Sequence, residues 1–205
     1  MIKYALNFKA GFENKCIQLF VEAYNQSIRD KSIHFDWHEN DITKQFHNYI
    51  NKNPLRSKWS ISSNVEHHLP QDLEIKTKGF ANKDLRMDMR FVKFKIRIFQ
   101  SNKEYEVYFE AKNLKEKDSS LKRRYIDIGI GNFVKRKYPL GFLVGYLLEG
   151  AVFSVIEGGI NLMLKNDNRE KECLHPKKHD LVTHYYESDH SGLCLKHLIF
   201  DFTKE

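Results

Sequence analysis

Two acidic residues and one lysine stand out in the middle of the chain because of their types and spacing. Glu110 and Lys112 lie in the alternating segment EYEVYFEAKNL at 104–114, and Asp88 lies in a second alternating segment, RMDMRFVKFKIRIF at 86–99. Carboxylate oxygens are suited to hard cations such as Mg²⁺ or Mn²⁺. A lysine beside them would stabilise negative charge on a phosphate. These residue types therefore indicate metal-assisted hydrolysis of a phosphate ester.

The two alternating segments predict antiparallel strands joined by the turn QSNK. In the segment at 86–99, apolar residues change from odd to even positions partway along, so we expect a β-bulge at residues 91–92. Carried through that bulge, the pairing places Arg90 opposite Glu110 and Asp88 opposite Lys112. The charged residues would then converge where the two strands end.

Other segments show helical or strand periodicity that would position this hairpin. We expect helices at 12–28, 39–51, 123–139 and 151–166, strands within 58–68, at 141–150 and at 192–202, and irregular connections at 70–85 and 115–122. A strand–helix–strand order after the hairpin favours parallel pairing through a crossover. The prediction is an α/β fold with a mixed central β-sheet flanked by α-helices.

The composition indicates one domain spanning 1–205 and an anionic partner. No Gly/Ser/Pro-rich stretch divides the 205 residues, and 34 Lys and Arg against 27 Asp and Glu give a net charge of +7. Nucleic acid is the leading candidate for the partner. Three widely spaced cysteines argue against a disulfide framework and favour a reducing cytoplasm. We expect no signal peptide, because the N-terminus MIKYALNFKAGFENK has no apolar core followed by a small-residue cleavage site. We expect no membrane span, because Glu149 and Glu157 interrupt the most apolar stretch.

Asp88 followed by Glu110-Ala111-Lys112 on a neighbouring strand resembles the PD-(D/E)xK nuclease superfamily, which has the restriction-endonuclease-like fold. Met87 stands where the family's proline would be, although that proline is often absent. The resemblance implies a Mg²⁺- or Mn²⁺-dependent phosphodiesterase. Asp88, Glu110 and the carbonyl of Ala111 would hold the metal, and Lys112 would assist catalysis. The alternative is a solvated hairpin face with ordinary salt bridges.

The superfamily commonly has one more acidic residue on a helix before the hairpin. Glu39, in HENDIT, is the first candidate, and Glu66, in NVEHH, is the second. Glu39 also has an alternative explanation, since an acidic residue in the first turn of a helix is favoured by the helix dipole. A second E-x-K triplet at 74–76 lies in a poor strand context.

Basic clusters beside the proposed site predict contacts with nucleic-acid phosphates. The segments KRRY and KRKY combine basic residues with an aromatic residue, and a solvated helix face is the alternative. The candidate residues are Arg90, Lys122, Arg123, Arg124, Lys135, Arg136 and Lys137.

Several other chemistries are disfavoured. The C-terminal cysteines and histidines have spacings that match neither a CxxC pair nor a C₂H₂ zinc module. These residues are Cys173, His175, His179, His184, His190, Cys194 and His197. The chain also lacks the G-x-x-x-x-G-K-[ST] phosphate-binding loop and the G-x-S-x-G nucleophile elbow.

The resulting prediction is a cytoplasmic, metal-dependent endonuclease that acts on DNA, serves in restriction or anti-phage defence, and works with a partner protein of that system. A homodimer would supply one site for each strand of a duplex. Two alternatives remain open. One is a non-catalytic module that binds nucleic acid or a protein partner on a retained nuclease-like fold, and the other is a nuclease for RNA or branched DNA.

Overall fold

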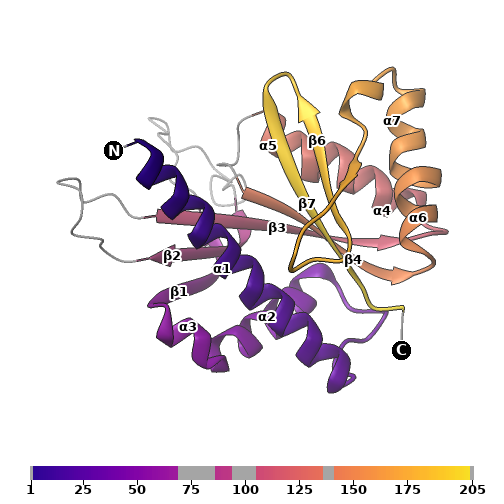
Figure 1. Ribbon diagram of the computed structural model, residues 1–205. Helices are drawn as coiled ribbons and strands as arrows, with labels where there is room; N and C mark the ends of the chain where they lie inside the picture. The colour runs from indigo at the N-terminus through magenta and orange to yellow at the C-terminus, as the bar shows by residue number, and fades with distance from the viewer. Residues whose placement is uncertain (1, 69–85, 94–104, 136–140, 204–205) are drawn as a thin grey trace, which may run out of the picture.

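A mixed β-sheet forms the centre of the protein in the computed structural model, which describes residues 2–68, 86–93, 105–135 and 141–203. The described strands form one seven-stranded sheet in the order β1-β2-β3-β4-β7-β6-β5 (Figure 1). Their bounds are Ile61–His68 for β1, Arg86–Lys93 for β2, Tyr105–Lys115 for β3, Gly141–Glu149 for β4, His175–Lys177 for β5, Tyr185–His190 for β6 and Leu193–Asp201 for β7. The central strands β3, β4 and β7 are parallel, and the outer pairs are antiparallel. The expected α/β class with a mixed sheet is confirmed.

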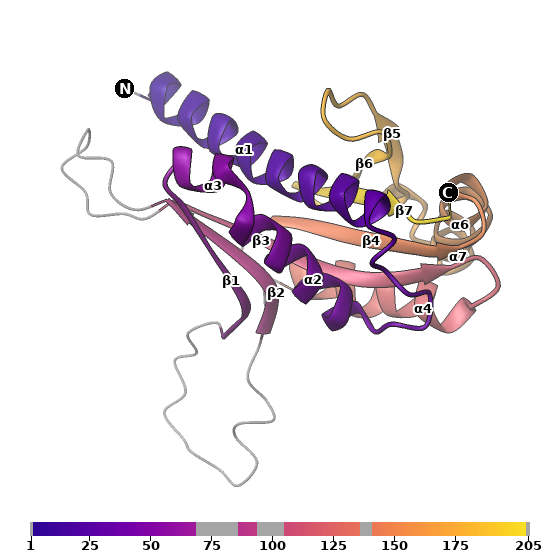
Figure 2. The same ribbon diagram turned by 90° about the horizontal axis from the view of Figure 1, so that it is seen from below.

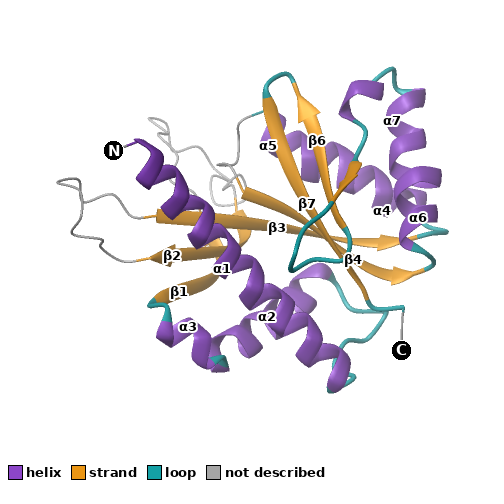
Figure 3. Cartoon of the chain, viewed as in Figure 1, coloured by secondary structure: helices purple, strands orange, loops and turns teal. Residues whose placement is uncertain are grey.

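Helices cover both faces of this sheet, as the views from two directions show (Figure 2; Figure 3). One face carries α1 (Ile2–Arg29) and α2 (Glu39–Lys52), with the short α3 (Pro54–Lys58) beside them. The opposite face carries α4 (Ser119–Arg124), the π-helical segment η2 (Tyr125–Ile130), α5 (Gly131–Val134), α6 (Val152–Val155), the π-helical segment η3 (Ile156–Asn161) and α7 (Leu162–Asn166). A 3₁₀ turn, η4 (Glu170–Glu172), leads into β5. No helix in these described ranges has the length and apolar character needed to cross a membrane.

Aromatic side chains fill the core beneath α1 and α2. Phe20 of α1 stacks on Phe109 of β3 with ring centroids 4.4 Å apart, and Phe46 of α2 meets Phe20 edge-on at 5.5 Å. Each of these rings is almost completely buried. Full burial of such a side chain contributes about 1.5–3 kcal/mol, so this core anchors both helices to the strands that carry the candidate site.

The expected helix at 123–139 begins earlier than predicted. Asp118 caps it, since Asp118 Oδ1 accepts hydrogen bonds from the backbone N–H groups of Ser120 (2.9 Å) and Leu121 (3.0 Å). The charged segment expected to be a loop therefore ends in α4. Helical structure continues through η2 and α5 as far as Val134.

The expected β-bulge in β2 is absent. The pairing of β2 with β1 runs without a shift from Ile61–Lys93 to His68–Arg86, and the pairing with β3 is equally regular. Both Phe91 and Val92 are buried. Two consecutive apolar residues are thus buried on opposite faces of a regular strand, and no bulge is needed to turn them to one face.

The register of the hairpin also differs from the prediction by two residues. Arg90 pairs with Tyr108 instead of Glu110, and the described pairing ends at Met89–Phe109. The QSNK turn and the irregular connection expected at 70–85 lie outside the described residues.

The remaining elements include several confirmed predictions and two strands that were missed. Strands β1, β3, β4 and β7 and helix α2 lie where periodicity predicted them, and α1 begins ten residues before the expected Phe12. The polar strands β5 and β6 were missed because YYESDH has no apolar alternation. Hydrogen bonds between buried polar side chains replace apolar packing on one face of β6.

Candidate active site

Strands β2 and β3 diverge (Figure 2), and their described pairing ends at Met89–Phe109. The candidate residues of both strands lie just beyond this pair. Asp88 Oδ2 accepts a hydrogen bond of 2.6 Å from the backbone N–H of Ala111. The side chain thus takes the position that a backbone acceptor would occupy in a continued ladder. This contact fixes Asp88 against the Glu110-Ala111-Lys112 segment.

Glu110 and Lys112 lie two residues apart on one face of β3, and each is only 4% exposed. Lys112 Nζ donates to Glu110 Oε1 and to the carbonyl oxygen of Ala111, both at 2.6 Å. The second carboxylate oxygen, Glu110 Oε2, is buried and has no hydrogen-bond partner among the described residues. A buried acceptor without a partner costs free energy, so this oxygen is a position where a ligand would be stabilising.

A glycine in the π-helical segment η2 accounts for the burial of Lys112. A Cβ atom on Gly129 would lie 3.6 Å from Lys112 Cγ and only 3.0 Å from Leu143 Cδ1. The missing side chain lets η2 pack directly over the aliphatic part of Lys112. Burial excludes water from the charged groups and strengthens their interaction.

Burial and neighbouring charges shift the pKa of both groups. Burial, reinforced by the negative charge of Asp88, raises the pKa of Glu110 to about 8, although Lys112 opposes the shift. Burial acts to lower the pKa of Lys112, but the carboxylates of Glu110, Asp88 and Glu39 outweigh it, and the pKa is raised. Lys112 therefore carries its proton at neutral pH and is a hydrogen-bond donor. The paired carboxylates repel each other, and a bound cation would relieve that repulsion.

Glu39, the first residue of α2, reaches the same cluster from a distant part of the chain. Its Oε1 atom accepts from Arg124 Nη2 at 3.0 Å and from Lys112 Nζ at 3.4 Å. The structure therefore brings Glu39 together with Lys112. The side chain of the other candidate, Glu66, lies outside the described part.

Asn113 helps to place Glu39 and was missed in the sequence. Its amide Nδ2 donates to the carbonyl oxygen of Trp37 at 2.8 Å, which holds the segment before α2 against β3. Asn113 is buried beside Lys112 on the opposite face of the strand. The signal in the sequence is its place in the alternating pattern, because the odd positions 105–111 carry apolar residues and position 113 carries an amide.

The basic residues predicted to contact phosphates have different surroundings. Lys122 is buried, and its ammonium group donates to the carbonyl oxygens of Lys115 and Glu116. This placement argues against Lys122 as a phosphate contact and identifies it as a link between α4 and the end of β3. Arg90 donates to Glu106 across the hairpin.

Arg123 and Arg124, although adjacent, point to different partners. Arg123 forms a two-pronged pair with Asp167, whereas Arg124 binds Glu39 at the candidate site. Lys135 is exposed. Arg136 and Lys137 lie outside the described residues.

The ligand types at the site fit a hard divalent cation. Across the described ranges, no three His, Cys, Asp or Glu side chains converge as a metal-binding group. The candidate set is instead the carboxylates of Asp88 and Glu110 with the carbonyl of Ala111, which already accepts from Lys112. Mg²⁺ typically keeps several waters and takes only one or two protein carboxylates. The partnerless Oε2 atom of Glu110 suits that mode of binding.

Two of the C-terminal histidines, His190 and His197, belong to a separate buried chain of hydrogen bonds. His197 Nδ1 lies 2.8 Å from Tyr125 Oη, and His197 Nε2 lies 2.8 Å from Ser188 Oγ. Ser188 Oγ lies 2.7 Å from His190 Nε2, and His190 Nδ1 lies 2.7 Å from Glu172 Oε2. These contacts join η2, β7, β6 and η4, which is a structural role.

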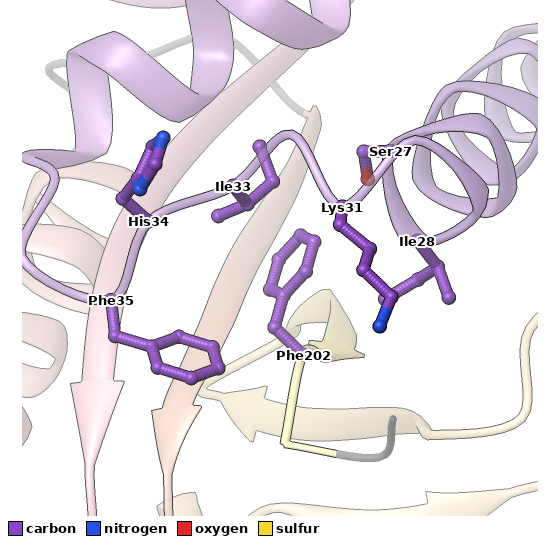
Figure 4. A pocket seen from close by; sticks show the side chains of 7 residues that line it. All are labelled: Ser27, Ile28, Lys31, Ile33, His34, Phe35 and Phe202. Atoms are coloured by element: carbon purple, nitrogen blue, oxygen red, sulfur yellow. The ribbon is translucent and has the colours of Figure 1, made fainter.

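A hollow of about 310 Å³ lies where the end of α1 approaches the C-terminal segment (Figure 4). Its lining is mainly apolar, with one ammonium group and no carboxylate, so it lacks the acidic pair that a divalent cation requires. None of the predicted site residues contributes to it. The lining residues are Ser27, Ile28, Lys31, Ile33, His34, Phe35 and Phe202.

Comparison of the chain with models of known protein families, with curated proteins and with solved structures gave no match.

Proposed function

We propose that this protein is a metal-dependent nuclease that hydrolyses phosphodiester bonds, with DNA as the expected substrate. The observation that carries the proposal is the buried Oε2 atom of Glu110, which has no partner among the described residues and lies beside a second carboxylate and a buried lysine. A purely structural ion pair would have its acceptors satisfied.

The residues of the candidate site have different proposed roles. Asp88, Glu110 and the carbonyl of Ala111 would hold Mg²⁺ or Mn²⁺, which supplies Lewis-acid stabilisation of a phosphate and activation of water when bound. Lys112 keeps its proton, so its role is to donate to an oxygen that gains negative charge. Glu39 balances the charge of Lys112 and limits its movement.

The arrangement of elements supports the resemblance to the PD-(D/E)xK superfamily. Asp88 and Glu110 lie on neighbouring antiparallel strands, and β3 leads through α4 to the parallel strand β4. The acidic residue Glu39 comes from a helix that precedes the hairpin. The restriction-endonuclease-like fold, the single-domain organisation, the cytoplasmic location, homodimerisation and a role with a partner protein in restriction or anti-phage defence are further parts of this proposal.

The test is cleavage of supercoiled plasmid DNA by the purified 205-residue chain with Mg²⁺ or Mn²⁺. Asp88→Asn keeps an acceptor for the Ala111 N–H while removing the charge, and Glu110→Gln removes the other carboxylate. Glu13→Gln is the matched control, because Glu13 is a carboxylate that pairs with Lys196, away from the site. Each variant must first show a wild-type circular dichroism spectrum.

We expect cleavage by the wild type and by Glu13→Gln, and none by the two site variants or with a chelator. Equal cleavage by all four proteins would contradict the proposal. If the wild type leaves plasmid intact, single-stranded RNA and branched DNA are the next substrates. Binding of these nucleic acids without turnover of any would favour a non-catalytic module.

A further inference from the structure

We propose that Arg124 couples metal binding to nucleic-acid binding: it holds Glu39 in the metal-free protein and transfers to a backbone phosphate when the metal is bound. This inference rests on the proposed function and assigns a positioning and substrate-binding role to one residue at that site.

Glu39 is held by two cations that differ in exposure. Both Arg124 Nη2, at 3.0 Å, and Lys112 Nζ, at 3.4 Å, contact the same carboxylate oxygen, Oε1. The Arg124 side chain is 49% exposed, Glu39 is 15% exposed and Lys112 is 5% exposed. Arg124 therefore lies at the opening of the site, and Lys112 lies at its base.

The charges of the cluster favour this exchange. Three acidic side chains (Asp88, Glu110 and Glu39) face two cations, Lys112 and Arg124, so without a metal the cluster has no net positive charge to attract a phosphodiester. A divalent cation adds two positive charges, which attract a phosphodiester, and it competes with Arg124 for the Glu39 carboxylate. Because the Arg124 side chain is half exposed, this ion pair contributes little to stability and costs little to break. The released guanidinium group is suited to two-pronged phosphate binding.

Arg123 provides a matched control within the chain. It has the same charge and lies on the same short helix, but its guanidinium group pairs with Asp167, which places it away from Glu39. Removing either arginine changes the net charge equally. Only removal of Arg124 changes a contact with the candidate site.

The experiment measures the affinity for a labelled DNA duplex by fluorescence anisotropy, with EDTA or with Ca²⁺ at constant ionic strength. Gel analysis in Ca²⁺ checks that the duplex stays intact. For the wild type, we expect Ca²⁺ to tighten binding about 5- to 150-fold, the usual range for coupled sites. For Arg124→Gln the ratio should fall well below that of the wild type, leaving only the attraction that the metal's own charge supplies. Arg123→Gln should weaken binding similarly in both conditions and keep the wild-type ratio, and Arg124→Lys should restore part of it.

A wild-type ratio retained in Arg124→Gln, or a wild type that shows no Ca²⁺-dependent gain, would overturn the inference. Plasmid cleavage measured in parallel separates this outcome from failure of the proposed function. If the wild type cleaves plasmid but Arg124→Gln keeps the wild-type ratio of DNA affinities in Ca²⁺ and EDTA, the coupling through Arg124 is rejected and the nuclease proposal stands. If the coupling depends on Arg124 but the wild type cleaves nothing, the protein has a metal-dependent binding site and the nuclease proposal is rejected.

Discussion

At the scale of single residues, Glu110 and Lys112 depend on each other. Both are buried in β3, and Lys112 Nζ lies 2.6 Å from Glu110 Oε1. A buried ion pair contributes little net stability, because desolvation offsets the attraction, but loss of one partner leaves an uncompensated charge. This asymmetry gives the pair a measurable signature that an exposed hairpin salt bridge would lack.

Replacement of Lys112 by Met should lower the free energy of unfolding by about 3–5 kcal/mol at pH 8.5, because the buried Glu110 loses the cation that favours its charged form. The double variant Glu110→Gln/Lys112→Met should recover most of this loss, because no buried charge remains. Urea denaturation in EDTA measures both. Equal instability of the single and double variants would show that lost packing, instead of the uncompensated carboxylate, dominates.

Metal binding gives a second prediction at this scale. A ligand that binds only the folded protein at a hundred times its Kd stabilises it by about 2.7 kcal/mol. Mg²⁺ or Mn²⁺ should therefore raise the Tm of the wild type and of Glu13→Gln. Asp88→Asn and Glu110→Gln should show almost no shift. An equal rise in all four proteins would place the ion elsewhere.

At the scale of elements, close packing beside glycines holds the site strands together. Gly141 begins β4 next to β3, and a Cβ atom there would lie only 2.3 Å from the backbone carbonyl oxygen of Tyr108. Backbone cannot move aside as a flexible side chain can. The parallel pairing of β3 with β4, which orders the segment carrying Glu110 and Lys112, therefore requires glycine at this position.

Gly141→Ala should lower the free energy of unfolding by at least about 2 kcal/mol through overpacking. Gly158→Ala is the matched control, because Gly158 lies in helical η3 and a Cβ atom added there would have no described atom within 4 Å. This control should gain up to about 1 kcal/mol from better helix propensity. Chemical denaturation compares the two variants. A neutral Gly141→Ala would mean that β4 can shift away from β3 without cost.

At the scale of the whole molecule, the buried histidine chain ties the C-terminal strands to the helices behind the sheet. Burial lowers the pKa of His197 to about 3, and His190 contributes in the same direction. The ordinary pKa of histidine is about 6.5. His197 is therefore neutral in the folded protein, and its contribution to stability is complete above pH 6.5 and is lost as the pH falls from 6.5 towards 3.

Acidification from pH 7.5 to pH 5 should cost the wild type about 2 kcal/mol through His197 alone. His197→Gln, which cannot ionise, should be less stable at pH 7.5 because Tyr125 and Ser188 lose a partner. Its loss between the two pH values should be smaller than that of the wild type by about the same 2 kcal/mol. Urea denaturation at both pH values checks this, and parallel pH slopes would contradict it.

Local patterns in the amino-acid sequence were enough to predict the elements that depend on neighbouring residues. Alternation identified β3 and β7, a continuous apolar run identified β4, and helical periodicity identified α2. The spacing of Glu110 and Lys112 placed both on one face of a strand, because side chains alternate with a period of two. These predictions needed no knowledge of which elements pack together.

Contacts between distant parts of the chain became visible only in the folded structure. Glu39 meets Lys112 across 73 positions of the chain, and Arg124 meets Glu39 across 85. The burial of Lys122 depends on η3, where a Cβ atom on Gly159 would lie only 2.6 Å from Lys122 Cδ. A charged residue is assigned to solvent by its local sequence, whereas its actual surroundings are set by which elements pack over it.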